Sequence, residues 1–324
     1  MAQARTIEIG LACYPDCQEA AVLGLTDLLV MASNIATRHR KQSVAALRVT
    51  HWRKRATDAP PSRTFDSAPD TTTKMTALIA PPSLVAPIPA HEAASWLDWL
   101  RSHHASGVML ASVCAGAFLL AETGLLGRRT ATTHWAYAER FRQRFPDVRL
   151  DTDKLIVDDG DIVTAGGVMA WTDLGLRLIS RYLGPSVMAE TARRMLLDPP
   201  GREQRYYSAF SPDLTHGDAA VLKVQHWMQA NDAREVSLAT LARKAGLEER
   251  TLMRRFRKAT GMTTNEYAQQ LRVGKAREKL QFEAKPIDRV AWDVGYADPN
   301  AFRKVFTRIV GLTPGEYRRR FRAA

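Results

Sequence analysis

Hydrophobic positions in the first two-thirds of the chain fall into short apolar runs and longer segments with one apolar face. Short runs bounded by turn residues predict strands, and apolar residues at helical spacing predict helices. We expect strands at residues 6–12, 47–52, 77–80, 108–113, 155–157 and 162–164, and helices at 20–38, 91–104, from about 117, 169–182 and 186–197. Strands that alternate with helices favour an α/β domain with a mainly parallel sheet.

Turn-forming residues interrupt this pattern in two places. Residues 56–73 are rich in Pro, Asp, Ser and Thr and predict a loop or a short hairpin. Asp159-Gly160 predicts a tight turn between the last two strands.

Beyond residue 217 the pattern changes to helical segments separated by Gly or Pro turns. The Asp-Pro-Pro-Gly sequence at 198–201 ends the last helix of the α/β region, and residues 211–217 are typical of a linker. We therefore expect an α/β domain over residues 1–212 and an all-α domain over residues 213–324.

The all-α domain contains the same helical unit twice. In the first unit Ser237 can cap a helix that ends at Gly246, where glycine permits a tight turn. A second helix over 248–259 places Leu252 and Phe256 on its inner face and basic residues on its outer face. An amphipathic helix with a basic exposed face, entered through a glycine turn, fits the major groove of DNA.

The second unit repeats this design. Pro286 opens its first helix, Gly295 makes the turn, and a helix over 298–308 turns Phe302 and Phe306 inward. The sequence therefore predicts two helix-turn-helix units. Their recognition helices are expected to enter successive major grooves, roughly 34 Å apart on one face of the DNA.

The distribution of charge agrees with a polyanionic partner. The chain carries 46 Lys and Arg against 34 Asp and Glu, a net charge of +12. From residue 217 onward there are 22 basic and 12 acidic residues, so +10 of this excess lies in the last third and +2 in the remainder. A near-neutral body with a basic C-terminal third is the charge pattern expected of a nucleic-acid-binding protein.

The residues of the two units also carry a family pattern. It is formed by Leu241-Ala242, Ala245-Gly246-Leu247, Leu252, Phe256-Arg257, Gly261, Ala291, Val294-Gly295-Tyr296, Phe302-Arg303, Phe306, Gly311-Leu312-Thr313-Pro314 and Tyr317-Arg318. Residues 217–324 thereby resemble the AraC/XylS family of bacterial transcription regulators, which implies sequence-specific binding to double-stranded promoter DNA.

The resemblance also implies which side chains contact bases. They are the exposed first-turn positions of each recognition helix: Arg250, Met253 and Arg254 in the first, and Pro299, Asn300, Arg303 and Lys304 in the second. Arg can contact guanine bidentately and Asn can pair with adenine, whereas Met253 and Pro299 can make only apolar or shape contacts. Lys258, Lys275 and Arg318 are expected to contact phosphates or to be solvated charge.

The three cysteines, Cys13, Cys17 and Cys114, form neither a disulfide framework nor a paired zinc motif, which fits a reducing cytoplasm. No basic-then-apolar signal segment opens the sequence. The uncharged, apolar stretch at residues 107–121 is shorter than the roughly 20 residues of a membrane helix. We therefore expect a cytoplasmic protein with no membrane span, no metal and no cofactor.

The most distinctive feature of the α/β domain is Cys114, which follows the apolar strand 108–113 and precedes Ala115-Gly116 and a helix. Such a turn predicts a nucleophile elbow. There the helix dipole is expected to lower the thiol pKa, and backbone N–H groups can bind an oxyanion or a carboxylate. The alternative is an inert cysteine buried in the core.

The sequence around this elbow carries a second family pattern, formed by Cys114-Ala115-Gly116-Ala117-Phe118, Gly124-Leu125-Leu126-Gly127, Thr132-Thr133-His134-Trp135 and Thr164-Ala165-Gly166-Gly167. Residues 6–197 resemble the ThiJ/PfpI, glutamine-amidotransferase-like domain, in the version fused to AraC-type regulators. The resemblance implies a flavodoxin-like, mainly parallel sheet. It also implies a ligand site at Cys114, Ala115, Gly116 and His134.

Departures from that family argue against catalysis. Hydrolases of the family often carry His directly after the elbow cysteine, where this chain has Ala115. The acidic residue of the first strand-to-helix segment is replaced by Ala21, although a shifted loop would bring Glu19 nearer. Covalent catalysis needs a base beside the nucleophile, and His134 is the nearby candidate. Cys114 is therefore interpreted as a vestigial nucleophile.

Three hypotheses follow. In the first, the protein is a transcription regulator whose N-terminal domain dimerises and binds a small-molecule effector, with RNA polymerase as a possible further partner. In the second, it is a ThiJ/PfpI-type cysteine enzyme, a hydrolase or hydratase using Cys114, with a DNA-binding tail. In the third, it is a DNA-architectural protein that binds all duplexes equally. We favour the first hypothesis, since the residues quoted above contain no complete Cys–His–acid set.

Overall fold

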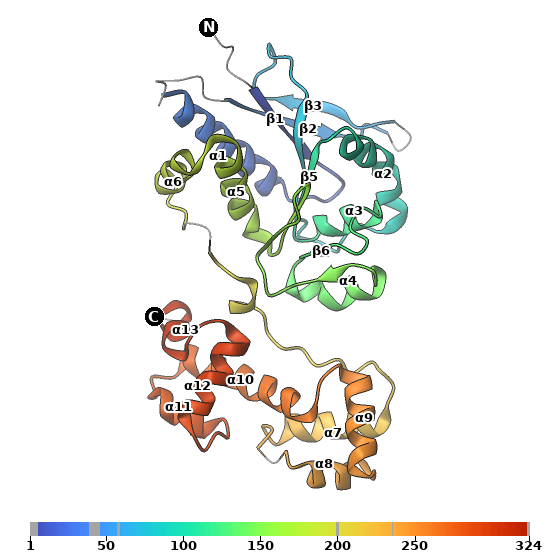
Figure 1. The fold of residues 1–324 in the computed structure, drawn as a ribbon, viewed down its shortest axis with the longest axis vertical. Coiled ribbons are helices and arrows are strands. Elements are labelled where there is room, and N and C mark those ends of the chain that lie inside the picture. The colour runs from blue at the N-terminus through green and yellow to red at the C-terminus, as the bar shows by residue number, and fades with distance from the viewer. Residues whose placement is uncertain (1–5, 39–45, 57–58, 199–200, 235, 323–324) are drawn as a thin grey trace. The chain divides into compact units, whose positions relative to one another are not determined.

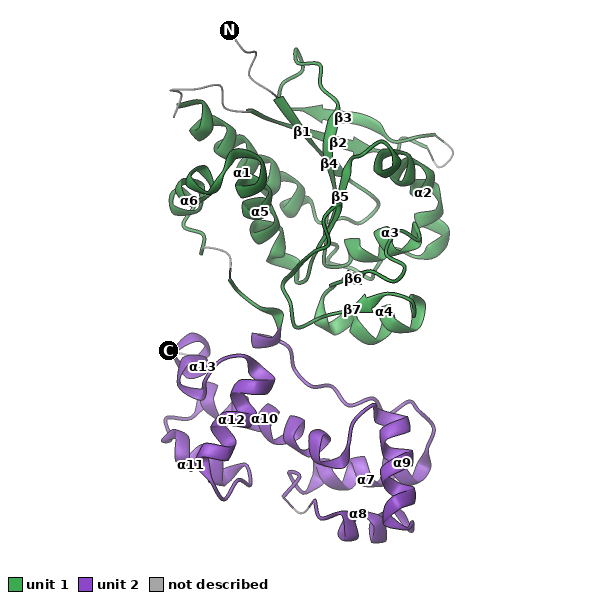
Figure 2. Cartoon of the chain, viewed as in Figure 1, with its two compact units in different colours: residues 1–204 green, residues 205–324 purple. Residues whose placement is uncertain are grey.

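The computed structural model describes residues 6–38, 46–56, 59–198, 201–234 and 236–322 (Figure 1). The chain divides into two compact units, residues 1–204 and 205–324 (Figure 2).

The first unit is built on a seven-stranded sheet in the order β3-β2-β1-β4-β5-β9-β8. The five central strands are parallel, and the edge strands β3 and β8 are antiparallel to their neighbours. Counted along the chain, the parallel strands run 2-1-3-4-5, which is the flavodoxin-like order. The predicted fold class is confirmed. The strands are β1 Thr6–Ala12, β2 Ala46–Arg53, β3 Ser62–Asp66, β4 Met75–Ala80, β5 Met109–Val113, β8 Ile156–Asp158 and β9 Ile162–Ala165.

Helices cover both faces of this sheet (Figure 1). Helices α1 Glu19–Arg38, α5 Trp171–Leu183 and α6 Pro185–Arg194 pack together on one face. Helices α2 Ala90–Ala105 and α3 Gly116–Glu122 pack together on the other. The strands between them are buried on both sides, which explains their continuous apolar runs.

Helix α1 is long and apolar enough to cross a membrane by length and composition alone. Within the first unit it is a core helix, because its Leu25, Leu28 and Leu29 side chains are fully buried. Gly175 of α5 lies so close to Leu28 that an added Cβ would stand 2.4 Å from Leu28 Cδ2. Packing against α5 therefore accounts for the apolar face of α1.

The structure refines several expected elements. The region 56–73 contains strand β3, which pairs with β2, so the hairpin alternative is the one observed. Helix α5 begins after a 3₁₀ turn, Val168–Ala170, and α6 ends at Arg194 rather than 197. Between residues 123 and 155 the sequence predicted no elements, because those present are too short to show periodicity. They are β6 Thr130–Ala131, a 3₁₀ turn Trp135–Tyr137, α4 Ala138–Arg144 and β7 Arg149–Leu150.

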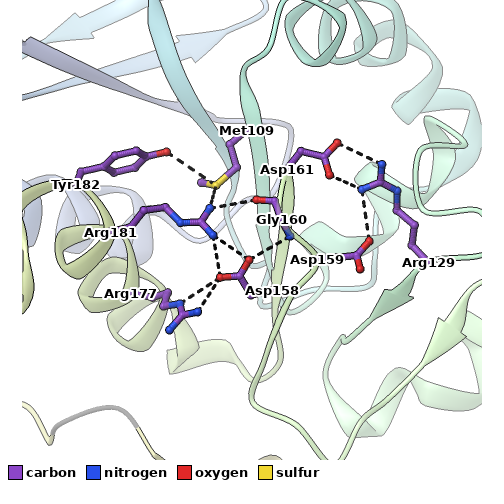
Figure 3. Close-up of polar contacts among 9 residues, drawn as sticks. All are labelled: Met109, Arg129, Asp158, Asp159, Gly160, Asp161, Arg177, Arg181 and Tyr182. Atoms are coloured by element: carbon purple, nitrogen blue, oxygen red, sulfur yellow. Dashed lines mark hydrogen bonds and ion pairs between the residues drawn. The ribbon is translucent and has the colours of Figure 1, made fainter.

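A cluster of ion pairs fastens the turn between β8 and β9 (Figure 3). Arg177 and Arg181 of α5 both donate to Asp158, with Nη2–O distances of 2.9 and 3.0 Å. Arg129 pairs with Asp161, and this contact lowers the pKa of Asp161 to about 2. The cluster lies beside Met109, the first residue of β5, at the opposite end of that strand from Cys114. It is therefore a structural fastening away from the elbow.

In the second unit the described residues form the helices α7 Ala219–Ala230, α8 Leu238–Ala245, α9 Glu249–Thr260, α10 Thr264–Phe282, α11 Ile287–Asp293, α12 Pro299–Val310 and α13 Pro314–Phe321. They form two separate hydrophobic cores. The long helix α10 contributes Tyr267 and Ala268 to the first core and Val273, Ala276 and Leu280 to the second. One continuous helix therefore joins the two helix-turn-helix units.

The two units divide between Gln204 and Arg205, whereas the sequence placed the boundary at residue 212. Gln204 is 2% exposed and belongs to the first unit. In the second unit, Arg277 of α10 donates to the carbonyl oxygens of Arg205 and Ser208. The segment after 204 is thus part of the helical unit, a long-range contact that its loop-like composition does not reveal.

Candidate nucleic-acid interface

The first helix-turn-helix unit consists of α8 and α9. Ser237 caps α8, since its Oγ accepts the N–H of Thr240 at 3.2 Å. Gly246 ends the helix with φ of 66°, a left-handed conformation that favours glycine. Helix α9 then buries Leu252 and Phe256 completely, so the cap, turn and inner face predicted from sequence are confirmed.

The outer face of α9 presents three of the predicted base-contacting residues. Arg250 and Arg254 are exposed, and Met253 is 49% exposed. Among the residues that the structure describes, Arg250 and Arg254 make no hydrogen bond or ion pair. Both guanidinium groups are therefore free to meet a nucleic acid.

The second helix-turn-helix unit consists of α11 and α12. Gly295 makes its turn with φ of 87°. Asp298 caps α12, because its carboxylate accepts the N–H groups of Asn300 and Ala301 at 2.9 and 3.1 Å. Phe302 and Phe306 are completely buried, as the sequence predicted.

On the outer face of α12, one of the predicted base-contacting side chains is already bound by other residues of the protein, unlike the arginines of α9. Asn300 and Lys304 are exposed, and Pro299 is half-buried at the first turn. Arg303 is half-buried and held by two side chains: its Nη1 donates to Asn300 Oδ1 at 3.1 Å, and its Nη2 pairs with Asp288 of α11. The structure thus gathers the predicted readers on one face of each recognition helix, but Arg303 is already engaged.

Several other cations serve the fold of the helical unit. Arg255 of α9 pairs with Asp218, the N-cap of α7, at 2.7 Å. Lys275 pairs with Asp232, and Arg318 donates to the Lys285 carbonyl at 2.6 Å. Of the three residues expected to contact phosphate or be solvated, Lys275 and Arg318 are thus engaged within the protein, and Lys258 is exposed. Only part of the basic excess is available to DNA.

In the α/β domain, residues 1–204, Cys114 occupies the predicted elbow between β5 and α3. Its φ of 52° is in the left-handed region, which is rare for a residue other than glycine. Its N–H donates to the Ala165 carbonyl at 2.7 Å. A Cβ at Gly116 would lie 2.4 Å from the Ala80 carbonyl oxygen, so this turn requires glycine. The geometry of a nucleophile elbow is present.

The elbow does not lower the pKa of its thiol, as a reactive cysteine would require. Burial raises the pKa of the Cys114 thiol to about 11, although a backbone hydrogen bond at Ala115 acts in the opposite direction. The side chain is 1% exposed and Ala115 is completely buried. The expectation that the helix dipole would favour the thiolate is therefore wrong, because desolvation of the charged form outweighs it.

The candidate base and acid also have other roles. His134 Nδ1 accepts the N–H of Ala136 at 3.1 Å, which caps a 3₁₀ turn, and burial lowers the pKa of His134. Glu19 pairs with Arg53 at 2.6 Å. Within the described ranges, no hydrogen bond joins the Cys114 thiol to a histidine or a carboxylate. Those same ranges contain no cluster of three or more His, Cys, Asp or Glu suited to hold a metal.

Two residues that sequence reasoning missed lie around the elbow. Tyr14, in the loop after β1, is 1% exposed, and its hydroxyl donates to the Pro81 carbonyl at 2.7 Å. This contact crosses the gap between the carboxyl ends of β1 and β4, where sheets of this topology bind ligands. Tyr14 is therefore buried at the edge of the sheet where a ligand would be expected.

The other is Gln204, which is hydrogen-bonded to the loop that contacts the elbow. Gln204 Oε1 accepts the N–H of Trp135 at 2.8 Å, and its Nε2 donates to the Thr133 carbonyl at 2.9 Å. Thr133 in turn donates from Oγ1 to the Cys114 carbonyl at 2.8 Å. A Cβ at Gly166 would lie 2.0 Å from Gln204 Nε2, so Gly166 is needed to admit this side chain. No local sequence signal marks Gln204, because its hydrogen-bond partners are 50 or more residues away.

Comparisons with known proteins agree with both halves of this arrangement. Residues 241–320 match a helix-turn-helix domain, and residues 85–181 match the DJ-1/PfpI family. The chain is 30% identical over 238 residues to the HTH-type transcriptional regulator GlxA of Rhizobium meliloti, covering 71% of this chain and 72% of that protein. It is 26% identical over 208 residues to the isonitrile hydratase of Pseudomonas putida, covering 64% of this chain and 84% of the hydratase.

Among solved structures, a putative transcriptional regulator from Vibrio parahaemolyticus matches 59% of this chain and all of that chain, with 18% identity and a TM-score of 0.47. The DNA-binding domain of AdpA in complex with a target DNA matches 32% of this chain and 92% of that chain, with 30% identity and a TM-score of 0.30.

A DJ-1/PfpI-type α/β domain followed by two helix-turn-helix units defines a sequence-specific DNA-binding transcription regulator. The chain belongs to the family of AraC-type transcription regulators that carry an N-terminal DJ-1/PfpI domain.

Proposed function

We propose that a small metabolite bound at the elbow of the N-terminal domain controls DNA binding by this regulator. The observation that carries the proposal is the position of Gln204, the last residue of the first unit. Its hydrogen bonds go to the loop 132–135, which also contacts Cys114. The next residue, Arg205, belongs to the DNA-binding unit.

The proposed ligand site comprises Cys114, Ala115, Gly116 and His134. Because the first three are buried in this conformation, we propose that a ligand displaces the loop that carries His134, which contacts Cys114 through Thr133. Movement of that loop would change the hydrogen bonds of Gln204, and with them the chain that leads into the helical unit. Ligand binding and DNA binding are coupled by linkage when the ligand favours one state of this loop.

We also infer that the domain is a sensor and not an enzyme. Support comes from the buried thiol, whose pKa of about 11 leaves little thiolate at neutral pH, and from the structural contacts of His134 and Glu19. Cys114→Ser should therefore leave DNA binding without ligand unchanged. Turnover of an isonitrile or amide substrate that Cys114→Ser abolishes would contradict this inference.

For the DNA interface we propose that bases are contacted by Arg250, Met253, Arg254, Pro299, Asn300, Arg303 and Lys304. Their common placement on the outer faces of α9 and α12 supports the proposal. We infer a cytoplasmic homodimer, in which two chains would present four recognition helices, with RNA polymerase as a partner at the promoter. The three free, buried cysteines support a reducing compartment.

The coupling is tested by selecting bound duplexes from a random pool with the full chain, with and without pools of small carboxylate metabolites. Gln204→Ala and Gly166→Ala both disturb the same contact, from its two sides. Each is expected to remove the effect of the metabolite on DNA affinity, which typically amounts to 5–150-fold in coupled systems, about 1–3 kcal/mol. Gln143→Ala is a matched control, since the exposed Gln143 side chain donates to Glu139 on the same helix. A metabolite effect that survives both variants would contradict the proposed route.

A further inference from the structure

We propose that Asp288 is a specificity-determining residue of this regulator, because it fixes the position of the Arg303 guanidinium on the second recognition helix. The inference concerns DNA recognition and is independent of effector control. It does rest on the assignment of Arg303 as a base reader.

The contacts of Arg303 show how it is fixed. Asp288 lies in the first turn of α11, and its Oδ1 accepts from Arg303 Nη2. Asn300, three residues before Arg303 on α12, accepts from Nη1 at 3.1 Å. Two side chains from two different helices therefore hold one guanidinium group from two sides.

This arrangement still leaves Arg303 able to read a base. A guanidinium carries five N–H donors, so about three remain after these two hydrogen bonds. Two suitably placed donors are enough to contact guanine O6 and N7. The Arg303 and Asp288 side chains are 42% and 49% exposed, so the pair lies at the protein surface.

Fixing the guanidinium favours discrimination over general affinity. A free arginine samples many rotamers and can reach phosphates of any sequence, and such contacts carry no sequence information. A carboxylate beside it cancels its charge toward phosphates and limits it to one orientation. Base reading by Arg303 then depends on whether the correct base stands opposite that orientation.

The first helix-turn-helix unit has no arginine–carboxylate pair at the equivalent positions. Counted from the helix-ending glycines Gly261 and Gly311, Met253 is equivalent to Arg303. Counted from the turn glycines Gly246 and Gly295, Ala239 is equivalent to Asp288. An acid and an arginine therefore occur together only in the second unit, which indicates a role specific to its recognition helix.

The test measures affinity of the full chain, by fluorescence anisotropy, for a duplex selected by the wild-type protein and for each of its single-base-pair changes. Arg303→Ala first identifies the base pair that Arg303 reads. Asp288→Asn is then expected to lower the preference at that same base pair by about tenfold, within the range for one bidentate contact. Affinity for random duplexes should rise, and the slope of log K against log salt should steepen by about one, because no carboxylate then cancels the charge of Arg303 toward phosphates.

Two variants separate positioning from a merely structural role. Asp293→Asn removes an acid from the same helix, but Asp293 pairs with Lys285 at 2.9 Å and not with α12, so the base preference should remain. Asp288→Glu keeps the carboxylate and should retain most of the preference. Thermal unfolding of each variant confirms that the domain is folded.

The outcomes are distinguishable. If Arg303→Ala changes no single base pair, Arg303 is not a reader and the proposal fails with that assignment. If Arg303→Ala has a positional effect but Asp288→Asn weakens all duplexes equally or leaves the preference intact, only the role of Asp288 is overturned. Neither result affects the proposed control by an effector.

Discussion

The two helix-turn-helix units share a fold but present different surfaces to DNA. Each has a recognition helix that ends at a left-handed glycine and buries two residues four positions apart, Leu252 and Phe256 in one and Phe302 and Phe306 in the other. The first offers Arg250 and Arg254, which make no hydrogen bond or ion pair within the described chain. The second offers an arginine that is already paired. Similar backbones therefore present a free pair of arginines in one unit and a fixed arginine in the other, and we expect the fixed one to add discrimination to the base contacts proposed for both helices.

The largest effect is expected from substitutions that disrupt the hydrophobic core of one helix-turn-helix unit at a time. Phe302→Ala should destabilise the second unit by about 3–5 kcal/mol, because it leaves a cavity where a completely buried ring stood. Since the two units have separate cores, the first should retain weak binding of low sequence preference. Leu252→Ala is the matched change in the first unit.

Denaturant unfolding and binding to selected and random duplexes measure both effects. If either substitution abolished all binding to the same degree, the units would not act separately, and α10 would transmit the damage from one core to the other.

A smaller effect is expected when the arginine–acid pair of the second helix-turn-helix unit is introduced into the first. Met253→Arg creates an exposed cation at the position equivalent to Arg303, without an acid at the position equivalent to Asp288. Affinity for all duplexes should rise by at most about 1 kcal/mol, with a steeper salt dependence, since the new charge meets phosphates. Adding Ala239→Asp supplies the equivalent of Asp288 on an exposed position of α8.

The double variant should lose the added general affinity and gain a preference at one base pair, which a repeated selection from random duplexes would detect. A double variant that binds as the single variant does would show that pairing alone does not create discrimination.

The smallest effect is expected at an ion pair in the other domain, Arg129–Asp161, which serves as a reference for a paired charge without a DNA role. The Arg129 hydrogen bond holds the pKa of Asp161 at about 2, below its ordinary value of 3.8. A carboxyl group with a lowered folded-state pKa stabilises the protein above its unfolded-state pKa and loses that contribution as pH falls through the folded-state value. The stability difference between the wild type and Asp161→Asn should therefore be constant above about pH 5 and should vanish between about pH 4 and 2.

Urea unfolding of both proteins across this pH range gives the difference directly. A difference that persists at pH 2 would mean that Asp161 acts through packing rather than charge.

Much of the architecture was predictable from the sequence. The succession of strands and helices along the chain, the cap at Ser237 and the glycine turns at Gly246 and Gly295 all follow from local patterns. Elements of two to seven residues between 123 and 155 did not, because they span too few residues for a periodic signal. The elbow geometry at Cys114 was predictable, but its chemistry was not.

The sequence by itself determined that the chain has an α/β domain and two helix-turn-helix units with basic outer faces, because apolar spacing and turn residues act over a few neighbours. Only the tertiary structure decided that the Cys114 thiol is buried, that Gln204 is fastened to the loop beside it, and that Asp288 holds Arg303. Each of these depends on residues 15 or more positions apart in the chain, brought together by packing. The exposure, ionisation and hydrogen bonds of these side chains follow from that packing, so they can be read only from the tertiary structure.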